Sequence, residues 1–98
     1  MNAALKKVVR IRINGKVQGV AFRYYTKIKA DKLDLKGTVQ NVEDGSVLVY
    51  AYGSDIQVKE LCAWCKAGGP PSAIVKKVIV DELNSIPSNQ YSEFSIIR

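Results

Sequence analysis

The spacing of apolar residues along this chain changes four times between a period of two and a period of about 3.6. Apolar and charged side chains alternate from Val9 to Ile13, which predicts a half-buried strand over residues 7–14. The pair Asn14 and Gly15 is expected to end it. Two further stretches rich in Val and Tyr, residues 36–42 and 46–53, are separated by Glu-Asp-Gly, which predicts an antiparallel hairpin.

Helical spacing appears in two segments between these strands. Residues 22–33 are predicted to form the first helix, with one side made by Phe22, Tyr25, Thr26, Lys29 and Leu33. The second helix has Val58, Leu61, Cys62 and Cys65 on its apolar side. Ser54 or Asp55 is expected to cap its start, and the Gly-Gly-Pro-Pro run at residues 68–71 to stop it.

The remaining segments complete the order of elements. Residues 74–80 and 91–97 read as strands, and residues 84–90 as a polar loop between them. The order is β-α-β-β-α-β with an extra C-terminal strand. It predicts one domain over residues 1–98 with a ferredoxin-like α+β fold, an antiparallel sheet carrying two helices on one face.

Composition removes several classes of chemistry. The 98 residues include no histidine, which excludes a Ser-His-Asp or Cys-His nucleophile and a histidine-ligated zinc site. Two cysteines are too few for a disulfide framework or a closed structural zinc site. Cys62 and Cys65 have C-x-x-C spacing, but they fall late in the predicted helix on its apolar side. We expect them to pack in the core, with Trp64 partly buried beside them.

The net charge of +6 lies in the first half of the chain, which favours anionic partners. There, residues 15–23 read GKVQGVAFR between the first strand and the first helix. Backbone N–H groups of such a loop can turn inward around an anion, next to the positive end of the helix. Arg23 can reach the same anion with its planar guanidinium. The loop lacks the Walker pattern, so nucleotide hydrolysis loses support.

Two alternatives stay open for these residues on composition and spacing alone. The glycines of the loop can simply shape a turn, with Arg23 a solvated surface charge. Asn41, near the end of the predicted strand 36–42, can donate to and accept from a water molecule, but asparagine is also common beside turns.

The loop at residues 15–23 and the stretch GTVQNVEDGSV at residues 37–47, closing at Gly53, together resemble the paired signature of the acylphosphatases. The resemblance extends through residues 69–73 and covers nearly the whole chain. It implies a small, metal-independent enzyme without cofactors that hydrolyses acyl phosphates to carboxylate and inorganic phosphate. Arg23 would bind the phosphoryl group and Asn41 would orient the attacking water. The implied phosphate-binding residues are Lys16, Val17, Gln18, Gly19, Val20 and Arg23.

One residue departs from the family pattern. An aromatic side chain usually follows the glycine that opens the second motif, and this chain has Thr38. Because side chains alternate along a strand, Thr38 is expected on the face opposite Asn41, so the departure should alter packing more than chemistry.

Two other functions remain as alternatives. The RNA recognition motif shares this order of elements, and Tyr50 and Tyr52 could stack on bases, but its Lys/Arg-Gly-aromatic signature is missing from the third strand. A non-catalytic anion-binding module is the other. The chain lacks a membrane-length apolar run and a signal-peptide pattern, so we expect a cytoplasmic protein without a membrane partner. The resemblance implies that it acts on a small acyl phosphate, and we expect a monomer without a nucleic-acid partner.

Overall fold

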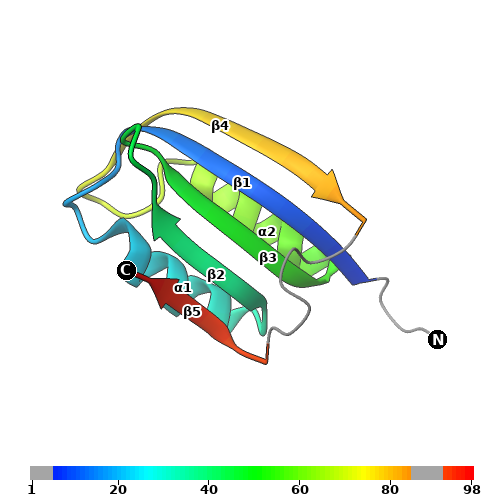
Figure 1. Ribbon diagram of the computed structural model, residues 1–98. Helices are drawn as coiled ribbons and strands as arrows, with labels where there is room; N and C mark the ends of the chain where they lie inside the picture. The colour runs from blue at the N-terminus through cyan, green and yellow to red at the C-terminus, as the bar shows by residue number, and fades with distance from the viewer. Residues whose placement is uncertain (1–5, 85–91) are drawn as a thin grey trace.

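The computed structural model describes residues 6–84 and 92–98. The elements follow in the order β1 (Lys6–Lys16), α1 (Phe22–Lys32), β2 (Lys36–Asn41), β3 (Val47–Ser54), α2 (Asp55–Lys66), β4 (Ile74–Leu83) and β5 (Phe94–Ile97). Both helices lie on one face of a single twisted sheet (Figure 1). This is the ferredoxin-like arrangement that the order of elements predicts.

The sheet has the strand order β4-β1-β3-β2-β5. The pairs β1–β3, β1–β4 and β2–β3 are antiparallel, as expected. β5 instead runs parallel to β2, so the fifth strand makes the sheet mixed rather than purely antiparallel. A hairpin signal fixes the direction of neighbouring strands, but no turn signal connects β5 to β2, because the two are distant in the chain.

Two strand ends differ from the predicted bounds. β1 does not stop at Asn14: its pairing with β4 shifts register between Asn14 and Gly15 and continues to Lys16. The φ of Gly15 is 134°, and a Cβ there would overlap the carbonyl oxygen of Ile74, so the shift requires glycine. β4 continues to Leu83 because β1 offers it a partner along that length.

β5 begins at Phe94, and Tyr91 lies outside the described residues, as does most of the predicted loop 84–90.

The core lies between the sheet and the helices. Val9, Ile11 and Ile13 of β1 are buried there together with residues of β3 and both helices. On α1 the fully buried positions are Phe22, Thr26 and Ala30, spaced by four. Tyr25 was expected on this side but is 42% exposed. The helix rests on β2 and β5 along a narrower stripe than the apolar residues of the sequence suggest.

α2 matches its prediction closely. Ser54 caps it, because the Ser54 hydroxyl accepts a hydrogen bond from the backbone N–H of Gln57 at 3.3 Å. Cys62 and Cys65 are buried and free, and they pack in the core as expected. Burial raises the pKa of Cys65 to about 12. Trp64 is partly buried, with its ring centroid 5.8 Å from that of Phe22.

Thr38 is half-buried, where an aromatic residue was expected from the resemblance. Thr38 lies three positions from Asn41 on β2, so the side chains of Thr38 and Asn41 leave opposite faces of the sheet. Thr38 pairs with Tyr50 of β3. The departure therefore affects the face without helices.

No helix in residues 6–84 and 92–98 is long and apolar enough to cross a membrane.

Candidate active site at the end of the sheet

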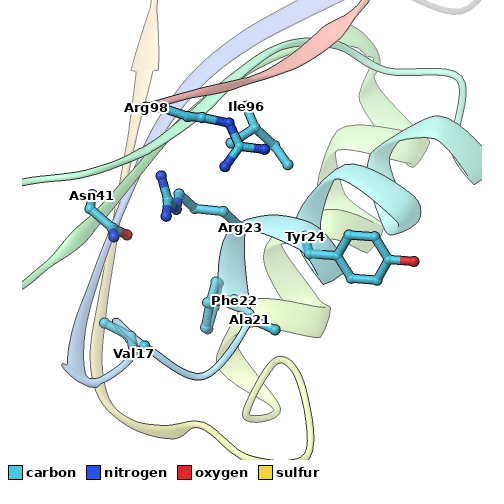
Figure 2. Close-up of a pocket in the computed structure, with 9 residues that line it drawn as sticks. Val17, Ala21, Phe22, Arg23, Tyr24, Asn41, Ile96 and Arg98 are labelled. Atoms are coloured by element: carbon cyan, nitrogen blue, oxygen red, sulfur yellow. The ribbon is translucent and has the colours of Figure 1, made fainter.

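A pocket of about 160 Å³ opens where β1 leads into α1 and β2 ends. It is lined by Val17, Gly19, Ala21, Phe22, Arg23, Tyr24, Asn41, Ile96 and Arg98. Arg23 and Asn41 come from different elements and face the same space (Figure 2). The pocket thus brings together the two side chains that sequence analysis singled out separately.

The loop between β1 and α1 forms one wall of the pocket. Val17 is 1% exposed and anchors the loop in the core, while Gly19 has a φ of 76° that favours glycine. Among the described residues, no loop or turn backbone hydrogen bond uses an N–H group from residues 17–20. These donors can therefore serve an anion in the pocket.

The start of α1 forms the adjoining wall. Ala21 takes the left-handed conformation, with φ 62° and ψ 25°, and no side chain caps the helix there. The first N–H groups of a helix have no intrahelical acceptor, so this end carries partial positive charge toward the pocket. No acidic residue occurs in the first turn to neutralise it.

Arg23, in the first turn of α1, is fixed by the last strand of the sheet. Its Nη1 donates to the backbone carbonyl of Ile97 at 3.3 Å. One side of the guanidinium is thereby held by β5, while the remaining N–H groups can meet an anion. Sequence analysis did not anticipate this contribution, because nothing near Ile97 marks it as an acceptor.

Asn41 is the last residue of β2, just before a tight turn. The turn is closed by the N–H of Val42, which donates to the carbonyl of Ser46 at 2.9 Å, and by the N–H of Gly45, which donates to the carbonyl of Val42 at 3.0 Å. Asn41 shares its face of β2 with the buried Val39, which directs its amide to the helix side of the sheet and into the pocket.

Asp44 stabilises the same turn from outside. Its Oδ1 accepts from the N–H of Ser46 at 2.9 Å and from the Ser46 hydroxyl at 2.6 Å. Arg12 donates to that hydroxyl at 3.0 Å and lies 3.5 Å from the second Asp44 oxygen. The hydrogen bonds from Ser46, with help from Arg12, lower the pKa of Asp44.

Gln18 links the loop to this turn. Its Nε2 donates to the carbonyl of Val42 at 2.7 Å and to the carbonyl of Ser46 at 2.9 Å. The Gln18 side chain was expected only as part of the anion-binding loop. In the structure it does not line the pocket, and it ties the loop to the turn that carries Asn41.

Two other expected members of the loop are placed differently. Lys16 is exposed at the end of β1, and Val20 is half-buried against the core. Neither side chain lines the pocket. Tyr24, Ile96 and Arg98 do line it and were not expected, because they carry no local signal of a binding site.

The face of the sheet without helices bears the tyrosines considered for base stacking. Tyr50 and Tyr52 alternate with buried residues of β3 and so lie on this face. The Lys6 ammonium lies 5.9 Å from the ring centroid of Tyr52, and Tyr50 raises the pKa of Arg10, although Asp81 raises it more. These residues are far better explained as contacts within the sheet surface than as a prepared base platform.

Comparison with known proteins gives one consistent result. A family model described as acylphosphatase matches residues 9–96. A protein named acylphosphatase from Acaryochloris marina (strain MBIC 11017) is 46% identical over 86 residues, which is 88% of each chain.

Solved structures agree with this match. The crystal structure of acylphosphatase from Bacillus subtilis superposes with a TM-score of 0.85 at 35% identity, over 94% of this chain and 99% of its own. An acylphosphatase from Coxiella burnetii superposes with a TM-score of 0.85 at 33% identity, over 99% of this chain and 100% of its own.

Proposed function

The chain belongs to the acylphosphatase family, and from that premise we propose that it hydrolyses acyl phosphates to a carboxylate and inorganic phosphate in the pocket between β1, α1 and β2. The observation that carries the proposal is that Arg23 and Asn41 converge on this pocket beside the loop of residues 15–20. The alternatives of an RNA-binding or a non-catalytic module have no comparable support.

In this proposal the phosphoryl group sits in the loop. Backbone N–H groups of residues 17–20, the open end of α1 and the Arg23 guanidinium all direct positive charge at its oxygens. Phosphoryl transfer depends mainly on positioning and on stabilising charge at the equatorial oxygens, and this arrangement can supply both. Lys16 adds charge from the exposed end of the loop, and Gln18 acts through the position of the loop.

Asn41 would hold the attacking water in line with the bond that breaks. The water oxygen forms a bond to phosphorus, the bond between phosphorus and the acyl oxygen breaks, and its electron pair leaves with the carboxylate. The proton of the water passes to a phosphate oxygen or to solvent. A carboxylate is a good leaving group, so the step needs no general acid, consistent with a chain that lacks histidine.

The test is hydrolysis of benzoyl phosphate by the purified protein with excess chelator. We expect turnover in the wild type, and a loss of about 10²–10³ in kcat/KM with weakened phosphate inhibition in Arg23→Ala, the scale of losing an oxyanion donor. Asn41→Ala should lower kcat while phosphate inhibition is retained, because the amide contacts water rather than phosphate.

Matched controls separate these effects from general damage. Arg10→Ala removes an arginine from the other face of the sheet, and Asn84→Ala removes an exposed asparagine at the end of β4. Both should keep wild-type kinetics. An equal collapse of phosphate inhibition in Asn41→Ala would contradict the role given to the water. An inactive wild type that is folded would refute the function.

A further inference from the structure

The pocket contains a second guanidinium, from Arg98. This residue follows β5 and lines the same cavity as Arg23. Figure 2 shows its side chain beyond that of Arg23, on the side away from Val17 and the loop. Arg98 is exposed, and within residues 6–84 and 92–98 it makes neither an ion pair nor a side-chain hydrogen bond.

Among the described residues, the only charged side chains that line the pocket are positive. None of the residues that line the cavity is acidic, while two are arginines. Arg23 has the carbonyl of Ile97 as a partner on one side, but Arg98 has no comparable contact in the described part of the chain. Two cations that border one small cavity repel each other until an anion lies between or beside them.

The position of Arg98 decides which part of a substrate it would meet. The inference rests on the proposed function, in which the phosphoryl group occupies the loop end of the pocket. The in-line geometry sends the leaving carboxylate away from Asn41. The wall on the side away from the loop is formed by Ile96 and Arg98, and the Tyr24 ring points away from both. That wall therefore borders the acyl group.

We propose that Arg98 determines specificity by favouring acyl phosphates whose acyl group carries a second anion, such as a carboxylate. Ile96 offers apolar contact to the carbon skeleton of that group, and Arg98 offers a charged fork to its far end. A neutral acyl group would gain only the apolar contact. Arg98 is exposed, so this selection takes place at the open rim of the cavity.

The experiment compares two rigid substrates that differ in one charge. 4-Carboxybenzoyl phosphate carries the second anion, and 4-carbamoylbenzoyl phosphate has nearly the same shape without it. For each variant, kcat/KM is measured on both, and the ratio of the two values is compared. Differences in intrinsic reactivity between the substrates cancel when the ratio of a variant is divided by that of the wild type.

We expect Arg98→Ala to lower this ratio by about 2- to 5-fold, the range of a single exposed ion pair. Arg98→Lys should retain part of the preference, because it keeps the charge but loses the planar fork. Raising the salt from about 0.05 to 0.5 M should move the wild-type ratio toward that of Arg98→Ala, since exposed charges are screened. Lys59→Ala, which removes a charge from α2, should leave the ratio unchanged.

Three results would overturn the inference, and they are distinguishable. If neither the ratio nor kcat/KM itself changes in Arg98→Ala, selection by this residue is refuted and the proposed function stays in place. An equal loss on both substrates assigns Arg98 to the phosphoryl group instead. A folded wild type that hydrolyses neither substrate refutes the proposed function, and the inference with it.

Discussion

Gln18→Met tests how strongly the loop is tied to the turn that carries Asn41. Methionine has nearly the length of glutamine but cannot donate a hydrogen bond, so the two bonds from Nε2 to the carbonyls of Val42 and Ser46 are lost. Each such bond contributes about 0.5–1.5 kcal/mol net. The hydrogen bonds that the two carbonyls keep after the substitution decide how large the combined loss should be.

Both carbonyls keep a backbone donor after the substitution. The Ser46 oxygen still accepts from the N–H of Val42, and the Val42 oxygen from the N–H of Gly45. No buried acceptor is left without a partner, so the larger desolvation penalty does not arise. We therefore expect the free energy of unfolding to fall by about 1–2 kcal/mol, which corresponds to a decrease in Tm of about 5–15 °C for a domain of this size.

Urea unfolding followed by far-UV circular dichroism measures the free energy of unfolding. The kinetics of benzoyl phosphate hydrolysis measure turnover and its inhibition by phosphate. Phosphate inhibition should weaken in the same variant, because the loop that is proposed to bind phosphate loses its attachment. Gln40→Met is the matched control, since Gln40 is half-buried on β2 and its side chain makes no hydrogen bond within the described residues. A loss no larger than that of Gln40→Met would refute the argument.

Four further outcomes can be checked on the same protein. Gly37→Ala should destabilise it by about 2–4 kcal/mol in urea unfolding, because Gly37 has a φ of 143° and a Cβ would overlap the carbonyl oxygen of Tyr50. Gly45→Ala should cost only about 1–2 kcal/mol, since its φ is 94° but nothing lies within 4 Å of the added atom. The pKa of Asp44 is lowered in the folded state, so its contribution to stability is present above the ordinary aspartate pKa and is lost as the pH falls through the folded value. Stability measured below about pH 4 should consequently decline less steeply in Asp44→Asn than in the wild type. With its pKa raised to about 12, the Cys65 thiol should react with a disulfide reagent at pH 8 only as fast as the protein unfolds, which mass spectrometry of the labelled chain can follow.

Much of the fold could be predicted because its signals are local. The Asp-Gly turn fixes the direction of β2 and β3, and the alternation in β1 marks the face that meets the helices. The cap at Ser54 and the apolar stripe ending at Cys65 define α2 in the same way. Each of these features depends on residues only a few positions apart.

The differences arise where distant segments meet. The parallel partner of β5 could not be read from the sequence, because no connecting turn specifies it. Asn14 and Gly15 resemble a strand end, but β4 provides a partner that carries the strand through a bulge. Tyr25 has the right spacing for the buried side of α1, yet it is exposed because the contact with the sheet falls on Phe22, Thr26 and Ala30.

In the candidate site, too, the residues marked by local motifs were predicted and the contacts between distant segments were not. Arg23 and Asn41 were found because they lie in two short motifs, and the structure places both at one pocket. The anchoring of Arg23 by Ile97, the link made by Gln18 and the presence of Arg98 depend on contacts across the sheet. Composition and spacing carry no information about such contacts.

The hydrogen bond from Arg23 to Ile97 joins residues 74 positions apart in the chain. Forming such a contact closes one of the largest loops in the molecule, and contacts of long sequence separation form slowly. On the ribosome, β1 to β4 can pair while the segment of β5 is still being synthesised, and the arginine then lacks its acceptor. The site around Arg23 is therefore completed only when the segment of β5 has been synthesised, after the four antiparallel strands are complete.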